Sequence, residues 1–253
     1  MAGVSRPEPP QVIPRPVNWR PGVAAPWEGW ADSSISVPRV VEALEAQGQA
    51  GPVPEDIGAD RVLGPSILIN ETVLPDVRFI NSAVLAVLFE EEGEARLLFT
   101  RRSSSLRAHR GEVSFPGGRL DGDETPTAAA LREAYEEVAL NPAEVSVVGW
   151  IHPVLTLVSG SLIMPVLATV ASRPRLVASP AEVERVFDVS LRELADPAIF
   201  HEERWTIPGR VIPGSSDNSF AVWFFEVEGE MIWGATARMI HELLSIVLVP
   251  SAS

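Results

Sequence analysis

The chain has 253 residues, of which 46% are hydrophobic, so it can bury the core of one large domain or of one domain with an extension. It has no cysteine, which excludes disulfide bonds, thiolate zinc sites and a cysteine nucleophile and fits a cytoplasmic location. Its formal net charge of −14 argues against binding to nucleic acid, which requires clustered lysine and arginine. The same charge opposes binding of a polyphosphate unless cations intervene locally.

The first 60 residues are predicted to form a proline-rich, partly disordered extension ahead of a domain at 61–253. The stretch "RPEPPQVIPRPVNWRP" has no periodicity, which predicts an extended or disordered arm over residues 1 to about 30. "SVPRVVEALEAQG" spaces its apolar residues as a helix does and closes on a glycine, which predicts one short helix. The N-terminus lacks the order of a secretory signal, and no apolar run reaches the roughly 20 residues of a membrane span. Membrane binding is therefore not expected.

A β-hairpin is predicted from Ile80 onward. "INSAVLAVLFE" is an apolar run of strand length, "EEEGE" is a turn, and "ARLLFTRR" is a second strand. Further predicted strands are "EVSVVGWI", "SLIMPVLATV", "EERWTI" and "AVWFFEV", and "ATARMIHELLSIV" is a predicted helix. Strands mixed with few helices predict an α/β fold with a mixed central sheet packed between helices.

A second helix is predicted from about Thr127 to Val138. Thr125 is a good N-cap, Pro126 suits the first helical position, and "NP" after Leu140 is expected to end the helix. At about 100° per residue, one side is apolar and is expected to pack on the sheet. That side carries Ala128, Leu131, Tyr135 and Val138.

Three carboxylates crowd the other side of this helix. Glu133, Glu136 and Glu137 spread over about 100°, a spacing at which hard oxygen ligands can share divalent cations. Taken alone, "REAYEE" is more often an ordinary solvated helix face, in which Arg132 pairs with Glu136. The upstream spacing favours a functional interpretation, because one glycine, one further glutamate and one arginine precede these three residues at fixed offsets.

This template resembles the Nudix box, the signature of the Nudix hydrolases. It covers residues 118 to 140. The glycine and all five charged residues of that signature are present: Gly118, Glu124, Arg132, Glu133, Glu136 and Glu137. Ala139 stands where the box has glycine, which costs stability if that residue needs a positive φ. Ala134 is a small occupant of an apolar position. Neither departure removes a ligand.

The segment "LFTRRSSSLRAHRGEVSFPGG" resembles the signature of the coenzyme A pyrophosphatase branch of this family. The matching positions are Leu98, Thr100, Arg102, Ser103, Arg107, Gly111, Phe115, Pro116, Gly117 and Gly118, with Phe99 as the one mismatch. "IWGATARMIHELL" also resembles this branch, less specifically. The resemblance implies a Nudix-type α/β/α sandwich and substrate-binding roles for Arg102, Ser103, Arg107, Phe115, Gly117 and Gly118. Strand alternation places Arg101 and Arg102 on opposite faces, so at most one faces the site.

The resemblance further implies hydrolysis of the diphosphate of coenzyme A or acyl-CoA, giving 3′,5′-ADP and (acyl-)4′-phosphopantetheine. Mg²⁺ or Mn²⁺ held by Glu133, Glu136 and Glu137 would make this chemistry accessible and offset the acidic charge of the chain. Glu136 is a ligand or the general base. Arg132 and Glu124 are expected to pair and brace the loop. A further acidic ligand is expected from Glu182, Glu184 or Glu203.

Two alternatives to the coenzyme A assignment stay open at this point. One is a Nudix hydrolase for another nucleoside diphosphate derivative, such as ADP-ribose or a dinucleotide. The other is a non-catalytic Nudix module that binds a ligand, although such modules usually lose a glutamate of the box. Arg101 and Arg110 are interpreted as surface arginines paired to acidic neighbours, and His109 as a structural or substrate-binding residue. The oligomeric state is open, with a homodimer as one alternative.

Overall fold

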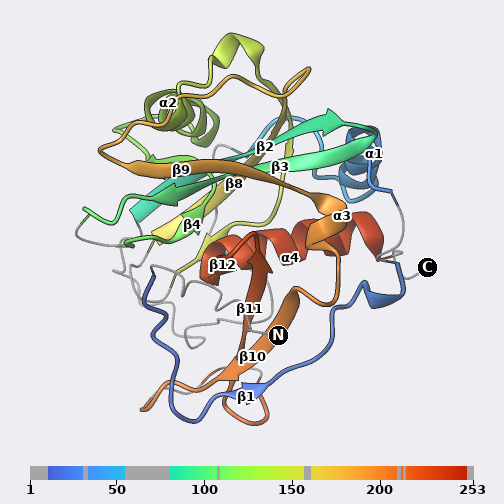
Figure 1. Ribbon diagram of the computed structural model, residues 1–253, viewed down its shortest axis with the longest axis vertical. Helices are drawn as coiled ribbons and strands as arrows, with labels where there is room; N and C mark the ends of the chain where they lie inside the picture. Colours follow the sequence, from blue (N-terminus) through green and yellow to red (C-terminus); the bar gives the residue numbers. More distant parts are fainter. Residues whose placement is uncertain are drawn as a thin grey trace, which may run out of the picture.

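The computed structural model describes residues 11–30, 34–54, 80–106, 109–156, 161–209, 212 and 215–249. These residues form two β-sheets with helices packed against them (Figure 1). Helix α2 (Pro126–Val138) covers one face of the larger sheet, and α4 (Gly234–Leu248) covers the other. The predicted α/β/α sandwich with a mixed central sheet is confirmed.

The larger sheet contains the predicted hairpin, β2 (Ile80–Glu91) and β3 (Glu94–Arg102). Its main path runs β4-β3-β2-β8-β6, where β4 is Val113–Ser114, β8 is Ser161–Thr169 and β6 is Ser146–Trp150. Only the β2–β8 pair is parallel in the described part of this sheet. Three strands lie off the path: β5 (Gly117–Arg119) on β2, β7 (Val154–Leu155) on β8 and β9 (Val183–Ser190) on β3.

Strand β9 was not predicted from the sequence. Its stretch, "VERVFDVS", alternates apolar with charged residues because one face packs on the core and the other meets solvent and ion pairs. The central strand β2 is instead apolar on both faces, since helices cover both. Ala83, Leu85, Val87 and Phe89 point toward α2, and Ala86 and Leu88 point toward α4.

Helix α2 begins as predicted, with the Thr125 side chain accepting from the Ala128 amide and Pro126 at the first position. It ends at Val138, as predicted, but the stop signal differs: Ala139 takes the left-handed conformation at φ 55° and ends the helix before the Asn-Pro pair is reached. Asn141 instead caps a short 3₁₀ turn, Pro142–Glu144. The positive φ confirms that the site of the missing glycine is the strained one.

The apolar face predicted for α2 is half right, because Val138 is buried and Leu131 packs against the core, whereas the other two residues face solvent. Tyr135 is 58% exposed and Ala128 is also exposed. The helix instead turns its alanines toward the sheet, burying Ala129, Ala130, Ala134, Glu137 and Val138. Small side chains let the helix approach the strands closely, and this close approach encloses the Glu137 side chain as well. The alanine run was the available signal, but bulk hydrophobicity outweighed it.

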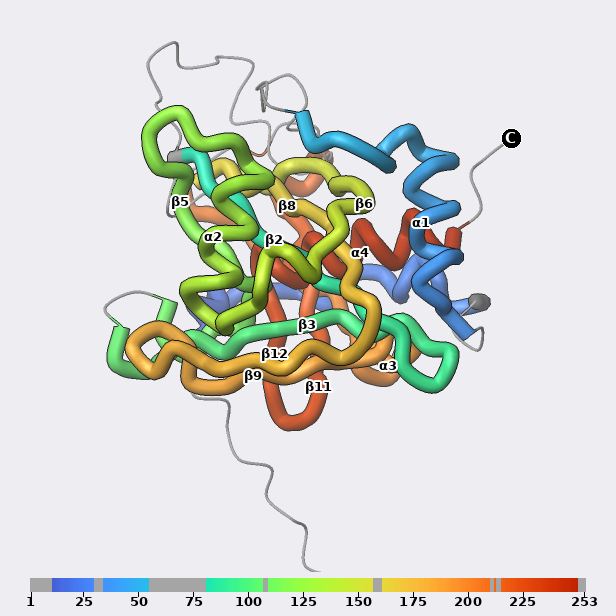
Figure 2. The backbone as a smooth tube through the Cα atoms, turned by 90° about the horizontal axis from the view of Figure 1, so that it is seen from above, coloured from blue at the N-terminus to red at the C-terminus, as the bar shows by residue number. Residues whose placement is uncertain are grey.

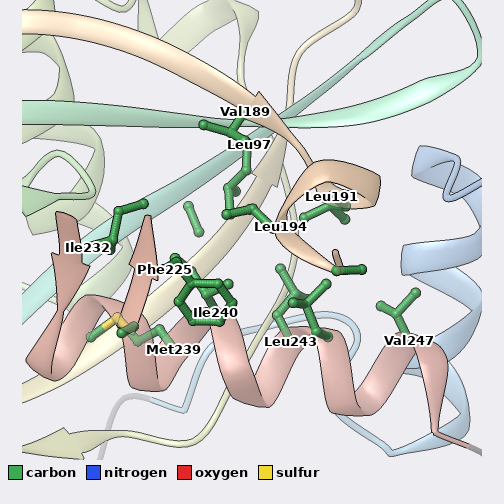
Figure 3. Packing of buried hydrophobic residues seen from close by; sticks show 14 of the residues in the cluster. Leu97, Val189, Leu191, Leu194, Phe225, Ile232, Met239, Ile240, Leu243 and Val247 are labelled. Atoms are coloured by element: carbon green, nitrogen blue, oxygen red, sulfur yellow. The ribbon is translucent and has the colours of Figure 1, made fainter. Parts of the chain in front are cut away.

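The smaller sheet packs against α4 and has the order β1-β10-β11-β12. Its strands are β1 (Arg20–Pro21), β10 (Phe200–Trp205), β11 (Phe220–Val227) and β12 (Glu230–Trp233). Figure 3 shows Ile240 and Leu243 on the side of α4 that faces the core, with Phe225 of this sheet beside Ile240 and Leu97 of the larger sheet above them. The short helix α3 (Leu191–Leu194) closes the same core. Within the described ranges, no helix is long and apolar enough to cross a bilayer.

The described part of the N-terminal segment lies against the domain. The predicted short helix is α1 (Val37–Ala46), which Figure 2 shows on the opposite side of the molecule from α2 and β5. Ahead of it are a 3₁₀ turn, Glu28–Trp30, and strand β1. Trp27 is fully buried and donates to the Ala195 carbonyl at 3.1 Å, and Arg15 pairs with buried Glu203 at 2.7 Å. The domain boundary at residue 60 stays a prediction.

Candidate active site

The acidic side of α2 faces strand β5, beside which it lies in Figure 2. Glu137 is on the buried face, with its side chain 3% exposed, and Glu133 is at the rim of that face, with 16% exposed. Glu136 turns outward, with 56% of its side chain exposed. The helix therefore brings two of the three predicted ligands against the glycines of β5 and leaves the third at the surface.

Glu137 is enclosed with little compensation for its charge. The Gly117 amide donates to Glu137 Oε2 over a long 3.4 Å, and Arg102 Nη1 lies 3.5 Å from Oε1. Burial raises the pKa of Glu137 to about 7, against the opposing effect of Arg102, and repulsion from Glu133 adds to the rise. A carboxylate in this position gains from a cation placed beside it.

Glu133 lies against a glycine that no other residue can replace without movement. A Cβ atom at position 118 would lie 2.2 Å from Glu133 Oε1, so Gly118 provides the space that this carboxylate occupies. Burial raises the pKa of Glu133 although Arg132 opposes the rise. Glycine is required at position 117 for a different reason: a Cβ atom there would lie 2.4 Å from the Ala83 carbonyl oxygen of β2.

Arg132 braces the loop between β5 and α2, as predicted. Its Nε and Nη2 donate to the two oxygens of Glu124 at 3.0 and 2.9 Å, and Nη2 also donates to the Arg119 carbonyl at 3.0 Å. Its Nη1 donates to Glu133 at 2.9 Å and to Glu136 at 3.3 Å. This pairing lowers the pKa of Glu124. A bidentate pair of this kind fixes the loop in one geometry.

These residues are suited to hold a divalent cation, although the side chains do not form a ready-made cage. Within the described ranges, no three acidic or histidine side chains converge closely enough to do so. Arginines occupy the positions beside the carboxylates, Arg132 against Glu133 and Arg102 near Glu137. The donors are nevertheless hard oxygens, buried and incompletely balanced, in a space that Gly118 keeps clear. The type of donor atom therefore suits Mg²⁺ or Mn²⁺, whereas the carboxylate and arginine side chains would have to rotate before a cation could bind.

The upstream segment divides between the site and the core. Arg102 reaches Glu137, whereas Phe115 is buried and stacks on Phe99 at 5.2 Å. Ser103 is buried too, and its hydroxyl lies 2.8 Å from that of Ser105. Arg107 lies outside the described residues. Phe115 and Ser103 thus shape the segment, while Arg102 is the one described arginine of the segment beside the carboxylates.

The opposite faces predicted for Arg101 and Arg102 are confirmed. Arg101 turns away from α2 and pairs with Glu230 at 2.6 Å and Glu184 at 3.2 Å. His109 lies 2.8 Å from Glu112, a local contact within its own loop. Arg110 donates to the Leu106 carbonyl rather than to an acidic neighbour, which corrects the predicted ion pair. The local turn brings that carbonyl within reach.

The three predicted further acids separate clearly. The negative charge of Glu182 acts on both Glu133 and Glu137 and raises the pKa of each, so Glu182 lies near them. Glu184 is engaged by Arg101, and Glu203 is buried in the smaller sheet beside Arg15. Two open hollows of about 410 and 440 Å³ lie beside Glu144 and beside Thr125 respectively, and neither is lined by the acidic face. The site is therefore located by its chemistry rather than by either hollow.

The fold and this site define an α/β/α protein with a carboxylate-rich helix whose donors suit a divalent cation. A model of the NUDIX domain matches residues 80–208, about half of the chain. The chain is 37% identical over 154 residues to a Nudix hydrolase NudL of Photorhabdus laumondii, covering 60% of this chain and 78% of that protein. It is 33% identical over 189 residues to NudL of an Enterobacter species, covering 74% and 94%. The chain belongs to the Nudix family.

Two more distant similarities extend the comparison. Nudix hydrolase 3 of Caenorhabditis elegans is 31% identical over 177 residues, covering 66% of this chain and 74% of that protein. A crystal structure of the Nudix hydrolase RenU from M. smegmatis has 23% identity and a TM-score of 0.40, covering 46% of this chain and 73% of that one. The family match confirms the coarser prediction of a Nudix hydrolase. The coenzyme A branch stays a prediction.

Proposed function

We propose that the protein hydrolyses the diphosphate of coenzyme A or acyl-CoA in the presence of Mg²⁺ or Mn²⁺. The products would be 3′,5′-ADP and (acyl-)4′-phosphopantetheine. The observation that supports the cation-dependent chemistry is the burial of Glu137 with its nearest arginine atom 3.5 Å away, next to Glu133, whose carboxylate fills the space that Gly118 leaves free. The coenzyme A assignment rests on the resemblance of residues 98–118 to that branch.

Glu133 and Glu137 would hold the cation, and Glu182, whose charge acts on both of them, would add a further ligand. When bound, the cation neutralises phosphate oxygens and lowers the pKa of water. Arg102 would bind a phosphate oxygen, since its guanidinium extends from the end of β3 to within 3.5 Å of Glu137. Glu136, exposed at the edge of the site, is placed to accept the proton of the attacking water or to add a ligand.

The Arg132–Glu124 pair would hold the glycine loop while these groups act. It anchors the loop at Arg119 and the helix at Glu133 through one guanidinium. Loss of such an outer partner typically costs about 10- to 100-fold in metal affinity or activity. The same arrangement explains how a chain of net charge −14 would bind a polyanion, since its local carboxylates would first collect cations.

Product analysis tests this proposal. Purified protein with Mg²⁺ is incubated separately with coenzyme A, ADP-ribose and a diadenosine polyphosphate, and the products are separated by anion-exchange chromatography. We expect 3′,5′-ADP and 4′-phosphopantetheine from coenzyme A, at a rate at least about tenfold above that for the other substrates, a difference of about 1.4 kcal/mol in activation free energy.

Two outcomes would overturn the assignment, each in a different way. Faster cleavage of ADP-ribose or the dinucleotide would move the protein to another branch of the Nudix hydrolases. No cleavage of any substrate, in a sample that still binds Mn²⁺, would favour the non-catalytic module. Glu133→Gln is the matched control, because it keeps the shape of the side chain and removes its charge, and it must abolish any rate assigned to this site. The cytoplasmic location and the homodimer stay predictions.

A further inference from the structure

Arg102 stands at the end of β3, where the backbone around it is firmly held. Its amide donates to the Glu112 carbonyl at 2.9 Å, and its own carbonyl accepts from the Gly111 amide at 3.2 Å. The ladder to β9 shifts register here, since Arg101 pairs with Arg185 and Arg102 with Val183. A shift of this kind re-aims a side chain. The backbone therefore directs the Arg102 guanidinium toward α2 without any help from its head group.

The Arg102 guanidinium makes fewer and longer polar contacts than that of Arg132. Its contact with Glu137 is 3.5 Å, longer than a good charge-assisted hydrogen bond, and its buried Nε has no hydrogen-bond partner among the described residues. Arg132 by comparison makes five hydrogen bonds of 2.9 to 3.3 Å. A guanidinium has five N–H donors, so Arg102 keeps most of its capacity for another acceptor.

A divalent cation on Glu137 would come close to this guanidinium. Cation–oxygen distances are about 2.0 to 2.6 Å, so an ion on Oε1 would share that oxygen with Arg102 Nη1. Two positive charges on one buried carboxylate repel each other. Arg102 is 27% exposed and has no close bond to break, so it can move away while the backbone stays in place.

We propose that Arg102 is an exchangeable counter-ion: it balances Glu137 in the cation-free protein, leaves when a divalent cation binds, and then offers its donors to the diphosphate. This inference rests on the proposed cation-dependent function. It makes Arg102 a competitor of the cation in the absence of substrate and a partner of the cation in its presence. The residue thereby couples the binding of cation and diphosphate, so that each becomes tighter when the other is bound.

The first test measures Mn²⁺ binding without substrate, by electron paramagnetic resonance of the free ion at pH 8.5. Arg102→Gln removes the competing charge, so its Mn²⁺ affinity should rise by about fivefold or more over the wild type. Arg102→Lys keeps the charge and should stay closer to the wild type. Arg110→Gln is the matched control, because it removes one positive charge of the same segment, on a side chain that donates to the Leu106 carbonyl. It should change the Mn²⁺ affinity less than about twofold.

The second test adds methylenediphosphonate, a diphosphate that is not hydrolysed. In the wild type it should raise the Mn²⁺ affinity, and in Arg102→Gln that increase should be at least about fivefold smaller. An equal increase in both proteins would overturn the proposal, as would an unchanged or weaker Mn²⁺ affinity of Arg102→Gln without diphosphonate.

A failure of the cation-dependent function and a failure of the Arg102 exchange give different results. If the wild type binds no Mn²⁺, the cation-dependent function itself is wrong. If the wild type binds Mn²⁺ but Arg102→Gln binds it no more tightly, only the exchange is wrong. Should Arg102→Gln not fold, Arg102→Lys carries the diphosphonate test alone: a lysine offers a point charge instead of a planar fork, so the increase should be smaller than in the wild type. An undiminished increase would contradict the proposal.

Discussion

Glu137 and Glu230 are equally buried carboxylates with very different neighbours. The Glu137 side chain is 3% exposed and its nearest cationic atom, on Arg102, is 3.5 Å away. The Glu230 side chain is 2% exposed, and one of its oxygens accepts from Arg101 at 2.6 Å and from Arg185 at 3.0 Å. The first lies between α2 and β5, and the second joins β12 to β3 and β9.

The difference is the one expected between a carboxylate that takes part in the proposed chemistry and a carboxylate that stabilises the fold. A carboxylate with two close arginines has little to gain from another cation, and its ion pairs tie the smaller sheet to the larger one. A carboxylate whose arginine stays at a distance keeps a charge that is incompletely balanced, and a proton or a bound cation can neutralise it. Burial alone is therefore a poor guide to function, and the tightness of the counter-ion is a better one.

The largest expected effect is on turnover. Glu137→Gln and Glu133→Gln should each lower the rate of coenzyme A hydrolysis by more than the roughly 10- to 100-fold typical for loss of an outer partner, because both remove a direct ligand. Initial rates at saturating Mg²⁺ measure this effect, and thermal melting checks the fold. Glu144→Gln, an exposed acid outside the site, is the control and should keep the rate. A near-normal rate for Glu137→Gln would remove it from the ligands.

The structural carboxylate should show the opposite behaviour. Glu230→Ala leaves Arg101 and Arg185 without their shared acceptor and should lower the free energy of unfolding by about 3 kcal/mol, since both arginines are partly exposed and water offsets some of the loss. Urea unfolding followed by tryptophan fluorescence measures the change. The rate per folded molecule should stay at the wild-type value. A folded variant with a large loss of rate would mean that the two carboxylates are not distinct in role.

The pH dependence of stability should single out Glu137. Its pKa is raised to about 7 from 4.5, so the folded, cation-free protein holds a proton that the unfolded chain releases. The stabilisation is complete below pH 4.5 and is lost as the pH rises through 7, up to about 3 kcal/mol in all. Unfolding in EDTA at pH 5 and pH 8 measures it. Glu137→Gln should remove this part of the pH dependence, and an unchanged difference between the two pH values would contradict the assignment.

The smallest effect tests the helix end without touching either carboxylate. Ala139 has a φ of 55°, a conformation that costs roughly 1 to 2 kcal/mol in residues other than glycine. Ala139→Gly should raise the free energy of unfolding by about 1 kcal/mol, because the gain is reduced by the greater freedom of glycine in the unfolded chain. Differential scanning calorimetry detects the change. A fall in stability would show that the alanine side chain makes a compensating contact.

Local chemistry was predictable where it depends on neighbours in the sequence. The hairpin of β2 and β3 follows from two apolar runs around Gly93, and the start of α2 follows from Thr125 and Pro126. The pairing of Arg132 with Glu124 was expected from the Nudix resemblance and confirmed. The buried face of α2 was only partly predictable, because large side chains such as Tyr135 were weighted above the alanines, and it is the alanines that pack closely on the sheet.

The sequence by itself determined the family, the positions of the main strands along the chain, the residue at which α2 begins and the set of charged residues available for chemistry. Only the tertiary structure decided which of those charges are satisfied. Glu137 is enclosed because alanines draw α2 onto the sheet, Glu136 directly before it stays outside, and Glu182 rather than Glu203 lies near Glu133 and Glu137. Such differences arise from contacts between residues far apart in the chain, since burial and counter-ion distance exist only after the elements have packed.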